Sequence, residues 1–277
     1  MRHLFKLVAV MLALSAFASA HAQSGKAEVV WINQAMFKIT TPGGKVIVTD
    51  PWLLKYPPAL PTPLTPAEYP SLESLGKVDV LLVTHAHGDH IIDAPGLAKL
   101  NNIPLWGAGD LNAALTTLGV LPPAQLPRFG VGGRVTPAPG IKVTAVHAEH
   151  SSVYVWNNPE TKKAETHPAG AAVGFIIELE NGFRIWHMGD TGLFADMKFI
   201  ADYYKPDLVL IPIGGHFVMD PRDAAKATKE FVQPKYAIPM HYASNPFLVG
   251  TPQEYMDALG SYPVKVFPIN PGDKLRF

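Results

Sequence analysis

The N-terminal part of the chain carries apolar runs of the length expected for β-strands. Three such runs occupy residues 28–32, 36–40 and 45–49. The Pro-Gly-Gly segment at 42–44 separates the last two runs, and it is typical of a tight turn, so we predict a hairpin or a β-meander here. A fourth run at 80–83 is short, continuous and β-branched at both ends, which favours a buried strand over a helix.

Beyond residue 90 the pattern alternates between strands and helices. Residues 121–140 are predicted to form turns and residues 156–170 a polar loop, whereas Asn181-Gly182 predicts a hairpin. The expected strands are 104–106, 141–147, 173–180, 183–187, 208–213, 237–240 and one near 266, and the expected helices are 91–100, 110–118, 195–204, 221–231 and 252–259. Paired strands followed by alternating strands and helices, in two rounds, predict an α/β fold with two facing sheets and helices outside, a four-layer αββα sandwich.

A proline-rich stretch interrupts this pattern. Seven prolines fall within residues 51–70, a density that excludes regular sheet or helix interior. Because a predicted strand follows soon afterwards, we expect a stiff loop rather than a linker.

Residues 1–22 have the features of a secretory signal peptide. Arg2 and Lys6 give a basic start, residues 7–17 are apolar, and Ala20-His21-Ala22 offers a small-x-small cleavage site. The apolar stretch is too short for a comfortable membrane span, so we expect no stable membrane anchor. The prediction is cleavage near Ala22 and export, most simply to the periplasm, with residues 23–277 forming a single domain.

Composition narrows the possible chemistry. The chain contains no cysteine, which excludes disulfides, thiolate metal ligands and a lipid-modified cysteine. Lys and Arg total 23 against 23 Asp and Glu, and no basic tract occurs, so nucleic acid is not an expected partner. A small-molecule substrate is the expected partner. The sequence does not indicate an oligomeric state.

The segment after the fourth apolar run concentrates metal-capable side chains. Residues 84–90 read Thr-His-Ala-His-Gly-Asp-His, and the possible ligands are His85, His87, Asp89 and His90. In an extended backbone His85 and His87 point to the same side, and Gly88 allows a turn that brings the last two round to the same point. Converging imidazoles and a carboxylate suit a borderline divalent ion such as zinc. The segment therefore predicts a metal site.

Three further metal-capable residues lie at the ends of later predicted strands. They are His150, Asp190 and His241. Each is a weak signal alone, because a lone histidine at a strand end is more often a satisfied polar residue and Gly-Asp-Thr is more often a turn. Ligands that gather at one edge of a sheet come from rigid elements, so together with residues 84–90 they predict one metal centre.

With these motifs the sequence resembles the metallo-β-lactamase-fold superfamily, whose HxHxDH signature matches residues 84–90. Within it, the chain is similar to the branch of metal-dependent hydrolases that includes L-ascorbate-6-phosphate lactonase and the phospholipase D acting on N-acyl phosphatidylethanolamine. The narrower likeness rests on His150-Ser151-Ser152, on residues 187–192 and 212–217, and on Pro239-Met240-His241-Tyr242. The resemblance spans roughly residues 28–270 and implies an αββα sandwich with a dinuclear site at one edge.

The resemblance also implies a role for each candidate ligand. By position, the first ion would be held by His85, His87 and His150, the second by Asp89, His90 and His241, with Asp190 bridging the two. Asp50 matches the superfamily's first motif and would lie behind the ligands, orienting one of them. The alternative for Asp50 is a turn aspartate before proline.

The ligand set predicts hydrolysis. Two divalent ions about 3.5–4 Å apart make a bridging hydroxide available near neutral pH, which is expected to cleave a lactone, phosphodiester or related ester-type bond. Zinc is favoured, although two aspartates also admit manganese or iron. Asp89 is expected to orient the nucleophile as well as ligate. His216 is expected to donate a hydrogen bond to a developing oxyanion, with a surface loop histidine as the alternative.

Other interpretations remain open at this point. The chain is alternatively a non-catalytic metal- or ligand-binding protein that retains the site, a β-lactam hydrolase, or an iron-dependent redox enzyme of the same fold. The loops at 52–76 and 156–170 are expected to decide the substrate. Side chains that would wall a pocket are Trp52, Tyr56, Phe217 and Tyr242. His147 is interpreted as a strand-end residue and His187 as a residue of the core or behind the ligands.

Overall fold

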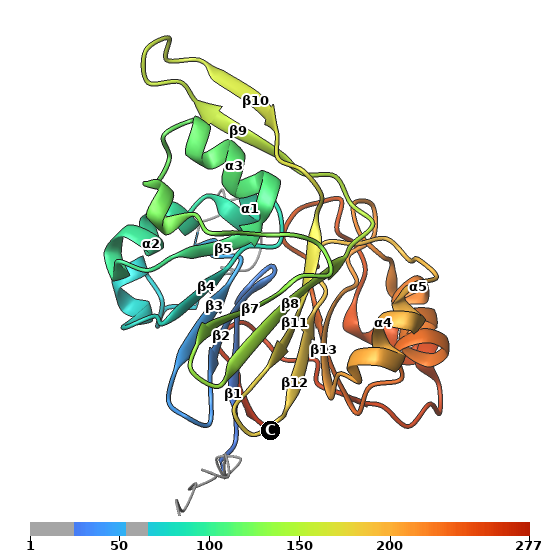
Figure 1. Cartoon of the computed structure of the whole chain (residues 1–277). Helices are drawn as coiled ribbons and strands as arrows, with labels where there is room; N and C mark the ends of the chain where they lie inside the picture. Colours follow the sequence, from blue (N-terminus) through green and yellow to red (C-terminus); the bar gives the residue numbers. More distant parts are fainter. Residues whose placement is uncertain (1–24, 54–65) are drawn as a thin grey trace, which may run out of the picture.

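Two seven-stranded sheets packed face to face, with helices on both outer faces, make up the computed structural model (Figure 1). The structure describes residues 25–53 and 66–277. This is the four-layer αββα sandwich of the metallo-β-lactamase fold, which confirms the predicted fold class. The predicted signal peptide at 1–22 and Tyr56 lie outside the described residues.

The first sheet contains the N-terminal strands and is closed by the last strand of the chain. In spatial order its strands are β16 (Lys274–Arg276), β1 (Glu28–Asn33), β2 (Met36–Thr40), β3 (Val46–Thr49), β4 (Val80–Leu82), β5 (Leu105–Ala108) and β6 (Arg128–Phe129). β16, β1, β2 and β3 pair antiparallel, whereas β3 to β6 pair parallel.

The second sheet follows the same plan, with antiparallel strands first along the chain and parallel strands after them. Its strands are β7 (Arg134–Ala138), β8 (Ile141–His147), β11 (Val173–Glu178), β12 (Arg184–His187), β13 (Leu208–Pro212), β14 (Tyr236–Met240) and β15 (Lys265–Val266). β7 to β12 pair antiparallel, and β12 to β15 pair parallel. In parallel strands the carboxyl ends meet at one edge, which brings the segments after them together.

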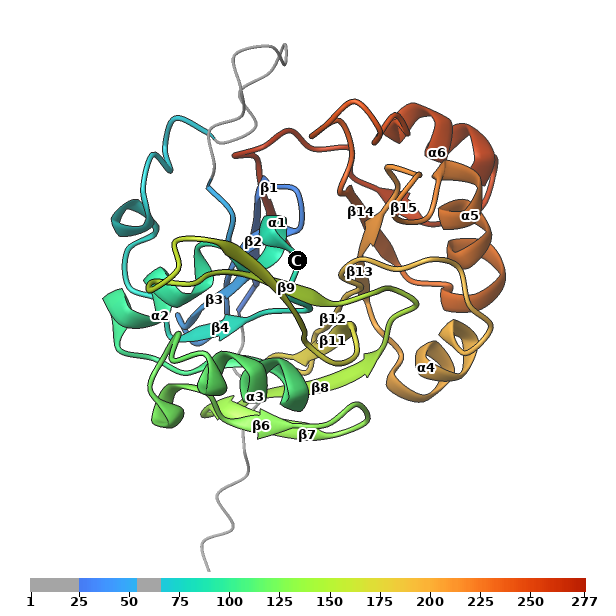
Figure 2. The same ribbon diagram turned by 90° about the horizontal axis from the view of Figure 1, so that it is seen from above.

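Helices flank each sheet on its outer side (Figure 2). On the first sheet they are α1 (Gly88–Ile91), α2 (Ala94–Asn101) and α3 (Gly109–Thr117), with short 3₁₀ turns at Leu72–Leu75 and Pro123–Gln125; on the second they are α4 (Met197–Tyr204), α5 (Pro221–Lys226), its π-helical continuation Ala227–Val232, and α6 (Pro252–Leu259). Local sequence explains the start of α6, because Thr251 and Glu254 exchange hydrogen bonds in a capping box. Among the described residues no helix is long and apolar enough to cross a membrane.

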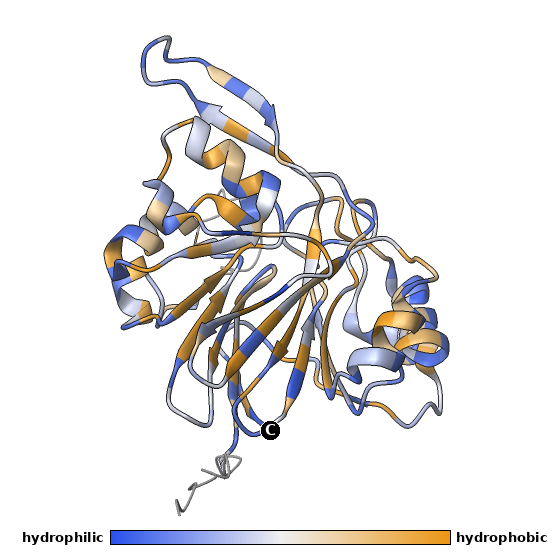
Figure 3. Ribbon diagram, in the orientation of Figure 1, coloured by the Kyte–Doolittle hydropathy of each residue, from blue (hydrophilic) through white to orange (hydrophobic). Residues whose placement is uncertain are grey.

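The strands of both sheets are largely apolar along their length (Figure 3), and their side chains alternate between two buried layers. In β11, Phe175 and Ile177 lie in the core between the two sheets, whereas Ile176 packs with Trp186 under α4 and α6. This period of two, buried on both faces, explains why the strands are continuous apolar runs rather than alternating ones.

Several predicted elements differ from the structure. The helix expected at 91–100 is two helices, α1 and α2, and α1 begins inside the metal-capable segment. Residues 121–140, predicted as turns, contain β6 and β7. The loop predicted at 156–170 is largely a hairpin of β9 (Val153–Asn157) and β10 (Ala164–Pro168), which projects beyond the sandwich (Figure 1). β7 was not predicted because Pro137 suggests a turn. An edge strand tolerates proline, and here the β7–β8 register is irregular between Val135 and Ala138.

Candidate metal centre

The segment carrying the histidines is held by Asp50, at the end of β3. One Asp50 oxygen accepts from the Thr84 backbone N–H at 2.7 Å, and the other accepts from the Thr84 hydroxyl at 2.7 Å. The second oxygen also lies 2.9 Å from His90 Nδ1. A carboxylate only accepts, so Nδ1 of His90 donates and its Nε2 is left facing the site. The contact between Asp50 and a candidate ligand agrees with the prediction from sequence.

The loop carrying Asp190 approaches this segment closely. Gly189 has a φ of +61°, and a side chain there would place its Cβ 2.9 Å from the Cβ of Thr84. The Val173 N–H also donates to the Thr84 carbonyl at 3.1 Å. Glycine at 189 therefore permits the two sheets to present their ligands to one point.

Three histidines form the first group of candidate ligands. His87 Nδ1 lies 3.0 Å from His85 Nε2 and 3.2 Å from His150 Nε2. A single N–H cannot satisfy three ring nitrogens that face one another, whereas one cation can accept a lone pair from each. The three come from the end of β4 and from the segment after β8.

Asp89, His90 and His241 form the second group. His241 Nε2 lies 3.4 Å from Asp89 Oδ2, and His90 Nε2 lies 3.7 Å from the same oxygen. These three residues each offer one ligand atom within mutual reach of a single ion. His241 follows β14, so this group also combines both sheets.

Asp190 lies between the two groups. Its Oδ2 is 3.0 Å from His241 Nε2 and 3.6 Å from His150 Nε2, while its Oδ1 is 3.2 Å from His90 Nε2. One carboxylate thus faces members of both groups, as the bridging role predicted from the resemblance requires.

The two groups differ in charge. Burial lowers the pKa of His85, His87 and His150, and for His85 the neighbouring His90 adds to this effect. The first group therefore consists of neutral imidazoles with free lone pairs.

In the second group, neighbouring opposite charges act against the effect of burial on the pKa values. Burial by itself lowers the pKa of His241, but Asp190 at 3.0 Å offsets this and raises it to about 9. Burial likewise acts to raise the pKa of Asp89, yet His90 and His241 hold it well below its usual range. Without a cation this group keeps its charge balance by holding protons on histidine, and a bound cation would replace them.

The residues present fit a metal ion. His90 Nε2 and Asp190 Oδ1 are both buried and neither makes a hydrogen bond, although they lie only 3.2 Å apart. Buried polar atoms are almost always partnered, and an ion between these two would satisfy both. His and Asp donors without cysteine suit zinc, manganese or iron.

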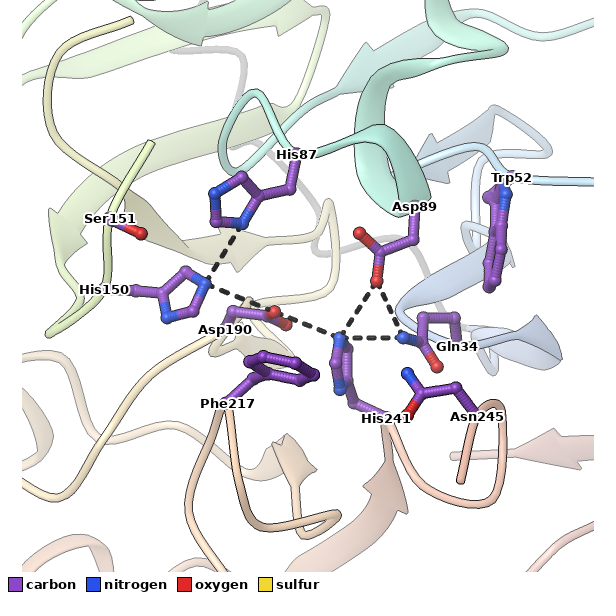
Figure 4. Close-up of a pocket in the computed structure, with 10 residues that line it drawn as sticks. All are labelled: Gln34, Trp52, His87, Asp89, His150, Ser151, Asp190, Phe217, His241 and Asn245. Atoms are coloured by element: carbon purple, nitrogen blue, oxygen red, sulfur yellow. Dashed lines mark hydrogen bonds and ion pairs between the residues drawn. The ribbon is translucent and has the colours of Figure 1, made fainter. Parts of the chain in front are cut away.

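A cavity of about 520 Å³ opens directly above these residues (Figure 4). Its lining residues are Gln34, Trp52, His87, Asp89, His150, Ser151, Asp190, Phe217, His241 and Asn245. A substrate that enters this cavity would therefore meet candidate ligands from both groups.

Comparisons with known proteins agree with this geometry. A family model described as a β-lactamase superfamily domain matches residues 45–242. A UPF0173 metal-dependent hydrolase from Polaromonas sp. is 61% identical over 279 residues, which covers 100% of both chains. The chain belongs to the UPF0173 metal-dependent hydrolases.

Solved structures share the fold of this UPF0173 hydrolase. Igni18, a metallo hydrolase from the archaeon Ignicoccus hospitalis, superposes with a TM-score of 0.72 at 30% identity, covering 91% of this chain and 98% of that one. YhfI from Bacillus subtilis, a metallo-β-lactamase fold protein, gives a TM-score of 0.62 at 13% identity over 91% of this chain and all of the other, which shows the fold alone.

The seven predicted ligands of the hydrolase lie together, but His216 does not join them. His216 has a φ of +57° after Gly215, and its ring stacks on Phe247 at 4.8 Å. It lines a neighbouring cavity, and the next residue, Phe217, lines the one above the ligands. Two successive left-handed residues turn the chain, so the aromatic ring takes the position expected for the imidazole. The geometry does not support a catalytic His216.

The remaining histidines and aromatic residues divide between the cavity, the surface and the core. Trp52 and Phe217 line the cavity as predicted, whereas Tyr242 packs against Trp31 with ring centroids 5.2 Å apart. His147 lies near Glu149 outside the cluster. His187 is buried in the core, where its Nε2 lies 2.8 Å from the Ala35 carbonyl.

Sequence reasoning missed Gln34 in this UPF0173 hydrolase. Gln34 lies in the turn between β1 and β2, and its amide nitrogen is 2.8 Å from Asp89 Oδ2 and 2.9 Å from His241 Nε2. The sequence does contain a signal for this position: two polar residues, Asn33 and Gln34, stand between two apolar runs.

Proposed function

We propose that this chain hydrolyses an uncharged carboxylic ester or lactone that carries an apolar group. The proposal rests on the chemical character of the side chains that line the cavity beside the candidate ligands. Beside the candidate ligands, its described lining is neutral and partly aromatic, with Trp52 and Phe217 on its walls, and no Lys or Arg of the described chain lines it. Proteins usually bind phosphate groups with Arg or Lys. The resemblance to the lactonase branch adds support for a lactone.

We further propose a dinuclear zinc centre in which the ligands divide as the sequence resemblance implies. When bound, the ions would supply hydroxide near neutral pH and polarise the oxygen of the scissile bond. The first position uses three neutral imidazoles, and the second uses Asp89 with His90 and His241. Asp190 faces both positions.

The chain's own residues orient the reaction. Asp89 is ionised, its side chain is 29% exposed, and it lines the cavity, so it can accept a hydrogen bond from the attacking water and orient it. Asn245 accepts from the Phe247 N–H through its side-chain oxygen, which leaves its amide nitrogen to donate to a substrate carbonyl (Figure 4). Trp52 and Phe217 would hold the apolar part of the substrate.

The test is a substrate panel on the metal-loaded full chain. The panel contains an alkyl-substituted lactone, an aryl carboxylic ester, an aryl phosphodiester and a β-lactam, each with and without a chelator. Chelator-sensitive turnover of the lactone or ester supports the proposal. Turnover of the phosphodiester or β-lactam alone overturns the substrate class. Metal binding with no turnover of any class favours the non-catalytic binding protein.

Phe217→Ala tests the aromatic wall. The ring is 49% exposed, so its loss should raise KM for an alkyl-substituted lactone by about 10-fold through lost apolar contact, with little change in kcat. The unsubstituted lactone should change less. Phe199→Ala, an exposed aromatic on α4, is the matched control. Equal losses for both lactones would contradict a wall that binds the apolar group.

We also propose that residues 1–22 direct export to the periplasm. The basic start, the apolar residues 7–17 and the Ala20-His21-Ala22 segment support this. N-terminal sequencing of the protein from a periplasmic fraction should begin at Gln23. Recovery of the intact chain from the cytoplasm would overturn it.

A further inference from the structure

Gln34 occupies an unusual position at the metal centre. It is buried in the tight connection between β1 and β2 and has a φ of +48°, a conformation that is uncommon for a residue with a side chain. Such backbone strain persists only where the surroundings hold it in place. Here, the Gln34 carbonyl accepts from the His241 backbone N–H at 3.1 Å and from the Trp31 indole at 3.0 Å. The residue is therefore fixed against both sheets.

The end of the Gln34 side chain lies where a ligand of the second group would lie. Its amide nitrogen is 2.8 Å from Asp89 Oδ2 and 2.9 Å from His241 Nε2, and those two atoms are 3.4 Å apart (Figure 4). Ligand atoms about 2.0–2.2 Å from one ion are spaced about 3–3.5 Å from each other. The three atoms thus form a triangle close to the size that surrounds a single ion.

The amide oxygen of Gln34 is buried and has no hydrogen-bond partner. The two ends of an amide have almost the same shape, so a half-turn about the last side-chain bond exchanges them. With nitrogen forward, the amide donates to Asp89 and lies 2.9 Å from His241 Nε2. With oxygen forward, it presents a lone pair to the point that those two residues share.

We propose that Gln34 is a ligand of the second metal position through its amide oxygen, and that its N–H₂ group fills this place when no ion is bound. The proposal rests on the two-ion site of the proposed function. It adds a neutral, exchangeable ligand to Asp89, His90 and His241, so the second position should bind its ion more weakly than a set of charged ligands would.

The experiment is a cobalt(II) titration of the chelator-stripped full chain, followed by visible absorption and equilibrium dialysis. Gln34→Gly removes the side chain without adding strain at positive φ, and Gln34→Glu replaces the amide by a carboxylate of the same length. Asn245→Asp is the matched control, because it also adds a carboxylate to the cavity but keeps the oxygen that accepts from the Phe247 N–H.

We expect Gln34→Gly to weaken the second ion by about 10-fold or more while the first ion binds as in the parent. Gln34→Glu should tighten the second ion, whereas Asn245→Asp should not. An unchanged or tighter second ion in Gln34→Gly would show that the amide only donates to Asp89. Equal weakening of both ions would show a structural role and would also overturn the proposal.

Two further outcomes separate this proposal from the proposed function. If Gln34→Gly fails to fold, the comparison of Gln34→Glu with Asn245→Asp decides alone: equal effects overturn the proposal. If the parent binds a single ion, the second position does not exist and the role of Gln34 falls, while chelator-sensitive ester hydrolysis with one ion leaves the proposed function standing.

Discussion

The two sheets supply the metal centre in different ways. The first sheet contributes four candidate ligands from one continuous segment, residues 84–90, which Asp50 anchors through Thr84 and His90. The second sheet contributes His150, Asp190 and His241 from three separate strand ends. We therefore expect a change at the shared anchor to displace several ligands of the first sheet together, whereas a change at one strand end of the second sheet should remove a single ligand.

The largest effect should come from Asp190→Asn, the one ligand change in the second sheet that reaches both groups. The amide keeps the shape but removes the charge that faces His150 and His241. Both ions should be lost and turnover abolished. Loss of a residue that only orients a ligand typically lowers metal affinity by about 10–100-fold, so this effect should be larger. Elemental analysis measures this, and full metal content would contradict the position of Asp190 between the groups.

His150→Ala should have the next largest effect. It removes one imidazole of the first group and leaves Asp89, His90 and His241 intact, so metal content should fall from two ions to one per chain. His147→Ala is the matched control, because His147 is the last residue of β8, close to His150 in the chain, but lies outside the cluster. Loss of both ions in His150→Ala would break the idea that ligands of the second sheet act separately.

Asp50→Asn tests the shared anchor of the first sheet. The amide cannot accept from both Thr84 groups and His90 as the carboxylate does, so several ligands should shift together. We expect both ions to bind about 10–100-fold more weakly. Isothermal titration with zinc measures the two affinities, and weakening of a single ion would argue against a common anchor.

Glu178→Gln should have the smallest effect, because Glu178 ends β11 far from the site. The Lys142 ammonium at 2.7 Å and Arg184 hold the pKa of this carboxyl below its ordinary value. A lowered folded-state pKa contributes stability above the unfolded pKa of about 4.3, and this contribution is lost as the pH falls through the folded pKa.

The variant should therefore be less stable than the parent by about 0.5 kcal/mol at pH 7, and the gap should close below about pH 4. Urea denaturation at both pH values measures it, with metal content and turnover unchanged. A gap that persists at low pH would point to lost packing rather than lost charge.

Much of the fold was predictable because its strands are apolar on both faces and are bounded by clear turn signals. The strands that the sequence did not predict are edge strands or a hairpin with mixed polarity: β6, β7, β9, β10 and β16. Half-exposed strands carry no strong apolar run, and β16 is defined only by pairing with β1, at the opposite end of the chain. Pairing between segments so far apart leaves no signal in the local pattern of apolar and polar residues.

The four-layer architecture, the seven candidate ligands and metal-dependent hydrolysis could be predicted from the chain's motifs and from the resemblance they carry, because His and Asp in dense, strand-end positions have few other uses. Which residues surround the candidate ligands depends on how the two sheets pack. The tertiary structure turned His216 away and Phe217 inward, since that depends on two left-handed residues in succession. It also brought Gln34 from the first hairpin against His241 on the other sheet, a contact between segments that no spacing along the chain relates.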